Sequence, residues 1–316
     1  MTGLKSCSLI IMFLITIPAV NAARCVYISS YHKGYDWSDG VERGLLKTLD
    51  SKCEITTFSM DTKRFKDEES IQQAALKARK LIDETQPDVV IASDDNASKY
   101  LIVPYYRDSD IPFVFCGVNW TVEQYGYPFS NVTGMIEVAA IEPMLLKAAA
   151  ISGKIKHAYY IGADTLTEQK NLKRFVDAGK KSNIRITSRL VHTMHEWIKA
   201  YKEAQQADLI IAGSNAGIKF WDEERVQDAI RPVTRTLSVT NHGWMMPYTM
   251  FGMTKIPEEQ GEWAGRVAIE IINGAKPSDI PIIPNRNFEI IVNNSLLDIA
   301  QIKLPEFIKL KAQPYF

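Results

Sequence analysis

Short apolar segments alternate with amphipathic segments along most of the chain. The apolar runs CVYIS, EITTFSM, DVVIAS and IPFVFCG are separated by helical patterns at about 38–49, 68–84 and 96–105. The order restarts after NVTGMIE, where HAYYIG, IRITSRLV, DLIIAG and TLSVT are separated by helical patterns at about 167–181, 196–206 and 220–230. Such alternation is typical of βαβ units. We therefore expect an α/β protein with two Rossmann-like lobes, each built on a parallel sheet.

Aromatic and polar residues gather where the predicted strands end. Open parallel sheets bind ligands at the carboxyl ends of their strands, so these loops supply the candidate ligand-binding residues. If the lobes close on each other, the loops of each lobe form one wall of a cleft. The candidates in the first wall are Tyr31, His32, Tyr35, Trp37, Asp94, Asp95, Asn96, Asn119 and Trp120, and those in the second are Asp164, Asn215, His242 and Trp244.

The first of these loops, YHKGYDW at 31–37, is unusually aromatic, because turns prefer small polar residues. Acidic side chains beside rings suit a cation, since ring faces attract ammonium groups. The same rings also stack on sugars or on aromatic ligands. Two interpretations need no ligand: Asp94 or Asp95 caps a helix start, or a tryptophan packs in the core. The basic segment at 63–66 is interpreted as a solvated turn.

Charge and composition point to a small partner. The chain has 37 basic and 37 acidic residues, and no basic block. This balance argues against nucleic acid as the main partner. Hydrophobic residues make up 46% of the chain, enough for packed cores.

The first 22 residues have the features of a secretory signal peptide. Lys5 precedes an apolar run of about 12 residues, whereas roughly 20 are needed to span a bilayer. Small residues end this segment at Ala22. We expect cleavage near Ala23 and a soluble mature chain in the periplasm.

The cysteines also indicate an oxidising compartment. If CVYIS and CEITTFSM are neighbouring parallel strands, their first residues lie side by side, so we expect a disulfide between Cys25 and Cys53. Cys116 is then unpaired, and we interpret it as a small buried hydrophobic residue.

Catalytic and metal-binding motifs are missing from the sequence. GSNAG at 213–217 places its serine one position too early for a nucleophile elbow, and the chain has neither a Walker A loop nor G-x-G-x-x-G. His32 and His242 lack a third ligand for a metal. We predict a binding protein without cofactor or metal. An exported enzyme is a distant alternative.

The C-terminal segment EEQGEWAGRVAIEIINGAKPSDIPIIPNRNFEIIVN resembles the corresponding part of periplasmic substrate-binding proteins of the ABC-type uncharacterised transport group. That family includes tryptophan and tyrosine binders. IPFVFCGVN and NVTGM are similar to its strand-loop and first crossover, and the similarity of pattern covers essentially the whole mature chain. The resemblance implies a type I periplasmic-binding-protein fold, in which two lobes joined by three crossovers hold the ligand between them.

The resemblance also implies how the chain works. The expected lobes are 23–136 with about 250–281, and 137–249 with about 282–316. Gly134 and Glu137 lie at the first crossover and are the expected hinge, because a hinge must change its backbone angles as the lobes close. We predict a monomer that delivers a small molecule to a membrane permease. A sensory protein that signals to a membrane kinase or cyclase is the alternative.

On ligand class, the resemblance favours an aromatic amino acid, whereas the acidic and aromatic residues also allow an amine or a sugar. The chain departs from the amino-acid binders of the family in the aromatic first loop and in Asn119-Trp120.

Overall fold

The computed structural model of the protein describes residues 22–315. The expected signal peptide at 1–22 lies outside the described residues except for its last position. Within the described part, no helix is long and apolar enough to cross a membrane.

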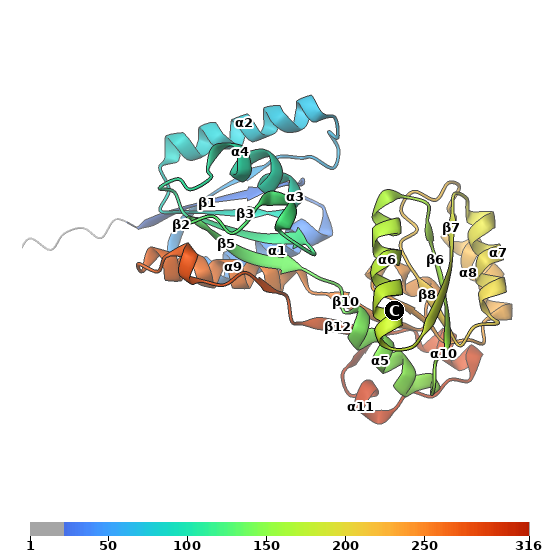
Figure 1. Ribbon diagram of the computed structural model, residues 1–316. Helices are drawn as coiled ribbons and strands as arrows, with labels where there is room; N and C mark the ends of the chain where they lie inside the picture. Colours follow the sequence, from blue (N-terminus) through green and yellow to red (C-terminus); the bar gives the residue numbers. More distant parts are fainter. Residues whose placement is uncertain (1–21, 316) are drawn as a thin grey trace, which may run out of the picture.

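Two lobes, each built on a central sheet, lie side by side (Figure 1). In the first lobe, all neighbouring strands are parallel. Its six strands, in spatial order, are β11 (Ile283–Pro284), β5 (Val132–Glu137), β4 (Phe113–Asn119), β3 (Val89–Ser93), β1 (Ala23–Ser29) and β2 (Cys53–Ser59).

Helices cover both faces of the first sheet. Successive side chains of a strand point to opposite faces, so Val26 and Ile28 pack in one apolar core, while Cys25 and Tyr27 pack in another. The helices of this lobe are α1 (Asp36–Leu49), α2 (Glu68–Thr85), α3 (Asp94–Ala97), η1 (Ser98–Ile102), α4 (Val103–Tyr105), η2 (Glu123–Tyr125), α9 (Pro257–Ile272) and η5 (Pro277–Asp279).

The second sheet is parallel except for one antiparallel pair, between β10 and β12. Its seven strands, in spatial order, are β13 (Ala312–Pro314), β12 (Phe288–Val292), β10 (Phe251–Lys255), β9 (Ser238–Thr240), β8 (Leu209–Ala212), β6 (His157–Ala163) and β7 (Arg185–Val191).

Two apolar cores also flank this second sheet, since Tyr160 and Ile161 of β6 belong to different clusters. The helices of the second lobe are α5 (Ile141–Ser152), α6 (Leu166–Lys181), α7 (Met194–Ala204), α8 (Glu223–Ile230), η3 (Arg231–Val233), η4 (Gly243–Tyr248), α10 (Asn294–Ala300) and α11 (Glu306–Lys309). The expected α/β architecture with two parallel-sheet lobes is therefore confirmed.

The chain crosses between the lobes three times: from β5 to α5, from β10 to α9, and from β11 to β12. The sequence-based division differs at two of these crossovers. It placed residues from about 250 in the first lobe, but β10 pairs within the second sheet. It placed residues from about 282 in the second lobe, but β11 pairs with β5 in the first sheet. Backbone pairing across the sheet sets these boundaries, and local sequence pattern does not encode that pairing.

A disulfide joins Cys25 in β1 to Cys53 in β2, with a Cα–Cα distance of 6.0 Å. The strands are parallel neighbours, but their register pairs Cys53 with Ala23, so the two cysteines are offset by two positions. Cys116 is buried in β4 and forms no disulfide within the described residues. A disulfide of this kind is typical of proteins in oxidising compartments.

Candidate functional site

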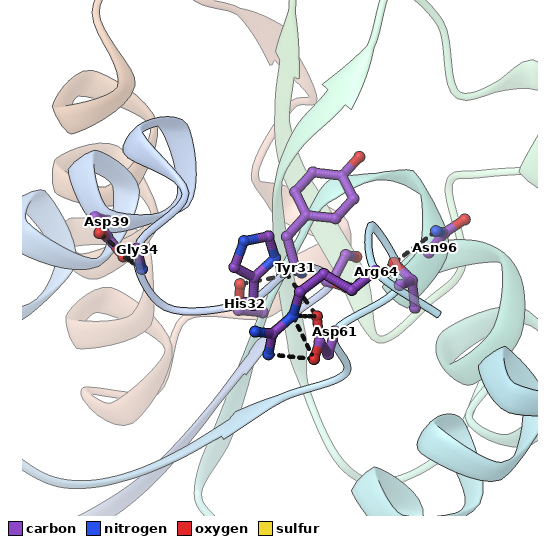
Figure 2. Close-up of polar contacts among 10 residues, drawn as sticks. Tyr31, His32, Gly34, Asp39, Asp61, Arg64 and Asn96 are labelled. Carbon is purple, nitrogen blue, oxygen red and sulfur yellow. Dashed lines mark hydrogen bonds and ion pairs between the residues drawn. The ribbon is translucent and has the colours of Figure 1, made fainter. Parts of the chain in front are cut away.

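The aromatic loop after β1 holds its rings against one another. The rings of Tyr31 and Tyr35 meet edge to face with centroids 5.4 Å apart. The imidazole Nδ1 of His32 lies 3.4 Å from Oδ1 of Asp61, a carboxylate that also pairs with Arg64. Figure 2 shows Tyr31 and His32 projecting from the loop beside this pair. The aromatic loop therefore contacts the turn that follows β2.

Trp37 lies in the first turn of α1, one residue after the helix begins, so it is not a loop residue. Its half-buried ring has the ammonium of Lys255 5.2 Å from its centroid. That lysine comes from the end of β10, where the chain returns to the first lobe. Trp37 therefore lies beside a crossover.

Asp94 has the most unusual environment of the expected site residues. It follows β3 directly, its backbone has φ of +70°, and its side chain is buried, with 2% of the residue exposed. Burial raises the pKa of its carboxyl well above the ordinary value, and the nearby carboxylates of Glu137 and Asp95 raise it further. Within residues 22–315, no hydrogen-bond donor reaches its Oδ2. A buried carboxylate oxygen without a partner costs free energy, and such costs are concentrated at functional sites.

Tyr31 belongs to the same electrostatic cluster. Burial raises the pKa of its hydroxyl well above the ordinary value, and the next contributions come from Asp94, Asp95 and Glu137. Burial also raises the pKa of the Cys116 thiol well above the ordinary value, and Asp94 and Glu137 raise it further. Acidic side chains from α3 and β5 therefore lie near one ring of the aromatic loop.

Asp95 and Asn96 brace the loops of the first lobe. The Asp95 carboxylate accepts hydrogen bonds from the side-chain amide of Asn119 at 2.7 Å and from the Tyr125 hydroxyl at 2.6 Å. The Asn96 amide donates to the hydroxyl of Thr62 at 2.7 Å. Neither Asp94 nor Asp95 caps the helix, because Ser93 is the residue at the N-cap.

Trp120 contacts the second lobe. Its half-buried ring packs against the core around α5 and α6, and the guanidinium of Arg174 lies 3.9 Å from its centroid. Its backbone has φ of +65°, which is uncommon for a bulky residue, and its N–H donates to the carbonyl of Glu137 at 2.9 Å. Trp120 therefore connects the first lobe to the second next to a crossover.

The two expected hinge residues differ in position. Gly134 lies inside β5, and a Cβ there would collide with the ring of Phe115, so packing requires this glycine. Glu137 ends β5, is buried, and pairs with Lys255 of the second crossover. At the third crossover, the Asn285 side-chain carbonyl accepts a hydrogen bond from the Val138 N–H at 2.7 Å. Polar contacts thus tie all three crossovers together.

In the second lobe, the expected residues lie in three separate places. Asp164 is exposed and accepts from Gln169, with His192 Nε2 3.2 Å from its other oxygen. His242 and Trp244 stack on each other with centroids 4.6 Å apart, and 56% of Trp244 is exposed. Asn215 lies in a separate turn after β8, where its backbone carbonyl accepts a hydrogen bond from the backbone N–H of Ile218.

A buried carboxylate in this lobe was missed by the sequence analysis. Glu168 of α6 is 2% exposed and accepts a hydrogen bond from the Tyr160 hydroxyl at 2.5 Å. Its other oxygen lies 3.7 Å from Nε2 of His242. A Cβ at Gly162 or Gly213 would collide with this carboxylate. The sequence signal was weak, because glutamate near a helix start is common and usually exposed.

Lys63 was also missed, although its position offered a signal. It follows β2 in one of the loops at the carboxyl edge of the first sheet, and this loop was interpreted only as a solvated turn. Its side chain is half-buried, whereas its neighbours Arg64 and Lys66 are exposed. The Lys63 ammonium lies 4.5 Å from the ring centroid of Tyr31 and 4.3 Å from that of Tyr35.

A hollow of about 400 Å³ lies elsewhere, beneath the C-terminal segment of the second lobe. Its floor is apolar, and its polar lining residues Asn294, Asp298, Lys303 and Lys309 are all exposed. Ligand sites usually combine an apolar surface with a few fixed polar groups. The buried carboxyl groups of Asp94 and Glu137 lie at the carboxyl ends of β3 and β5 instead. No group of three or more His, Cys, Asp or Glu side chains in the described part is placed to hold a metal.

Comparison with known proteins gives structural matches only. No protein-family model and no curated protein sequence matches the chain. A ligand-free, open substrate-binding protein with adhesive properties from Clostridium difficile is 14% identical, with a TM-score of 0.75 over 93% of this chain and 99% of that one. An ABC domain from Streptococcus pneumonia in complex with L-Trp is also 14% identical, with a TM-score of 0.65 over 94% and 100%.

A periplasmic ribose ABC transporter protein from Conexibacter woesei is 15% identical, with a TM-score of 0.56 over 89% of this chain and 95% of that one. These likenesses span both lobes. The chain has the type I periplasmic-binding-protein fold.

The type I periplasmic-binding-protein fold gives the buried groups a common setting. Asp94 and Tyr31 lie at the carboxyl ends of strands in the first lobe, and Glu168 and His242 lie at the corresponding ends in the second. Each lobe thus presents at least one buried carboxyl group near aromatic side chains at the edge where open parallel sheets bind ligands.

Proposed function

We propose that this protein is a periplasmic solute-binding protein that closes over a small molecule carrying an aromatic ring and a protonated amine. The observation that carries the proposal is the buried Oδ2 of Asp94, which no hydrogen-bond donor within residues 22–315 reaches and which lies near Tyr31, whose ring packs on that of Tyr35. An ammonium group supplies the missing donor, and a ring stacks on the tyrosines. An aromatic amino acid and an aromatic amine both have these groups.

Closure follows from the division of the site between the lobes. Asp94 and Tyr31 belong to the first lobe, and Glu168, His242 and Trp244 belong to the second. A ligand that contacts both lobes binds the closed form more tightly and shifts the population toward it. We propose that the protein acts as a monomer and that an ABC permease in the membrane recognises its closed form.

Thermal unfolding against a ligand panel tests this proposal. The panel contains L-tryptophan, L-tyrosine, tryptamine, tyramine, putrescine, ribose, glucose and adenosine. A ligand at 100 times its dissociation constant stabilises the folded state by about 2.7 kcal/mol. We expect the aromatic amines or amino acids to raise the melting temperature. Indole-3-propionate, which keeps the ring and lacks the amine, should have no effect.

Two further measurements test whether a stabilising ligand binds between the lobes. The radius of gyration from small-angle X-ray scattering should fall on addition of a ligand that raises the melting temperature. Asp94→Asn should lose the effect of the ligand, whereas Asp110→Asn, which changes an exposed aspartate, should keep it. Stabilisation by sugars or nucleosides alone would contradict the proposed ligand class, and conversion of a bound ligand to product would make the protein an enzyme.

A further inference from the structure

The turn that follows β2 directs Lys63 toward the aromatic loop. Thr62, the preceding residue, is buried, donates a hydrogen bond to the carbonyl of Ser30 at 2.6 Å, and accepts one from Asn96 at 2.7 Å. These bonds fix the backbone next to Lys63. Its side chain is therefore half-buried in a turn whose following residues are exposed.

The ammonium of Lys63 is held by rings. It lies 4.5 Å from the ring centroid of Tyr31 and 4.3 Å from that of Tyr35, and it donates to the Tyr35 hydroxyl at 2.9 Å. None of the ion pairs found within residues 22–315 includes Lys63. Two ring faces thus take the place of a carboxylate partner.

The charges around this position favour a cation. Asp94, Asp95 and Glu137 lie close enough to Tyr31 to raise the pKa of its hydroxyl, after the larger effect of burial. Lys63 in turn lies close enough to Asp94 to oppose the rise in the pKa of that carboxyl. A ligand carboxylate placed here would be repelled by three acidic side chains. An ammonium group is attracted by both the rings and the carboxylates.

We propose that Lys63 is an internal competitor of the ligand. In the ligand-free protein its ammonium lies against the rings of Tyr31 and Tyr35, where the aromatic ring of the ligand stacks when the ligand ammonium reaches Asp94, and binding displaces Lys63 toward solvent. This inference rests on the proposed function. It identifies Lys63 as the residue that sets how tightly a ligand must contact the tyrosine rings in order to bind.

A tethered competitor makes the site selective. Because Lys63 is attached to the same lobe, its effective concentration at the rings is in the millimolar range. Inorganic cations and small aliphatic amines gain only the contacts that Lys63 already makes, so they do not displace it. A ligand with its own ring adds contacts to Trp244 or Tyr31 and binds in spite of Lys63.

Calorimetric titration of four proteins tests the proposal, with tryptamine and L-tryptophan as probes. Lys63→Met empties the position, Lys63→Arg keeps a cation there, and Lys66→Met removes an exposed charge from the same turn. A cation–π contact is worth about 0.5–2 kcal/mol, so we expect Lys63→Met to bind about 2- to 30-fold more tightly than the wild type. Lys63→Arg and Lys66→Met should match the wild type within about twofold.

The position of the Lys63 ammonium can be measured without reference to affinity. After reductive methylation with ¹³C-formaldehyde, the NMR signal that is absent from Lys63→Arg belongs to Lys63. We expect ring currents to move this signal away from those of exposed lysines in the free protein, and saturating tryptamine to return it to them. A signal at the exposed position in the free protein would overturn the proposal.

The two proposals fail in different ways. If tryptamine or L-tryptophan binds the wild type and Lys63→Met binds it equally or more weakly, Lys63 is not a competitor, while the proposed function stands. If no member of the ligand panel binds the wild type or Lys63→Met, the proposed function is overturned, and the competitor with it. If tryptamine binds Lys63→Met but not the wild type, both proposals are supported.

Discussion

Asp94 combines three unfavourable features in one residue: a left-handed backbone, a buried carboxyl and an oxygen without a donor. Each costs free energy in the ligand-free protein. Aspartate tolerates the backbone angle better than most residues, but no hydrogen-bond donor within residues 22–315 reaches Oδ2 of its carboxyl. Such a cost is expected where a ligand supplies the missing interaction.

The raised pKa of Asp94 has a testable consequence for stability. A carboxyl whose pKa is higher in the folded than in the unfolded state destabilises the fold above the unfolded-state pKa of about 4, and the penalty disappears as the pH falls below that value. Asp94→Asn removes the ionisable group and suits a φ of +70° equally well. We expect the variant to have a higher free energy of unfolding than the wild type at pH 7, with no difference at pH 4, in urea titrations.

The same substitution should weaken ligand binding. Hydrogen bonds to charged groups contribute about 1.5–3 kcal/mol, so the loss should be roughly 10- to 150-fold in affinity. A less stable Asn variant at pH 7 would mean that ionised Asp94 supports the fold, which would contradict the functional interpretation.

At the scale of elements, glycines allow helices α1 and α9 to pack closely against each other. A Cβ at Gly44 would collide with the backbone carbonyl of Glu258, and one at Gly261 with the carbonyl of Val41. The two helices therefore approach backbone to backbone. This contact anchors α9 on the first lobe, although the chain has just left the second (Figure 1).

We expect Gly261→Ala to lower the free energy of unfolding by about 1–3 kcal/mol, because the helices must move apart. Helix propensity alone predicts the opposite sign, since alanine is favoured over glycine by about 1 kcal/mol. Chemical denaturation distinguishes the two. Glu270→Ala, an exposed position of the same helix, is the control and should change stability by less than about 0.5 kcal/mol. If Gly261→Ala raised the free energy of unfolding, the helices would have space for the added methyl group, which would contradict the close backbone packing.

At the scale of the whole molecule, the lobes are connected by strands that polar side chains hold together. Glu137 ends the first strand to cross, and Lys255 ends the second. They form an ion pair in which the Glu137 side chain is 7% exposed and the Lys255 side chain 24%. The ion pair therefore couples two of the three crossovers where the lobes meet.

Breaking this pair on one side should be costly. Lys255→Met leaves Glu137 buried without its cation, and we expect a loss of about 3–5 kcal/mol in the free energy of unfolding. The double variant Glu137→Gln with Lys255→Met removes both charges and should be more stable than the single one. Arg43→Met, which breaks an exposed pair with Glu258, should cost less than about 1 kcal/mol. If Lys255→Met and Arg43→Met lowered the free energy of unfolding equally in urea titrations, the coupling of the two crossovers by the buried ion pair would be contradicted.

Much of the architecture could be predicted because it follows from local periodicity. The alternation of strands and helices, and with it the two-lobed α/β fold, depends on side chains that alternate within a few residues. The aromatic loop was visible because Tyr31 and Tyr35 directly follow an apolar strand. Trp37 was placed in that loop, but it lies in α1, because helix boundaries depend on backbone hydrogen bonds that sequence pattern locates only to within a few residues.

The sequence by itself determined the order of elements and the edge at which aromatic and polar side chains gather, because both depend on neighbours along the chain. Only the tertiary structure decided that Lys63 lies on the tyrosine rings, that Glu168 is buried under Gly162 and Gly213, and that Lys255 meets Glu137. It also decided which sheet takes β10 and β11. These contacts join residues far apart in sequence, and their energies depend on burial and distance, which are set only when the sheets assemble.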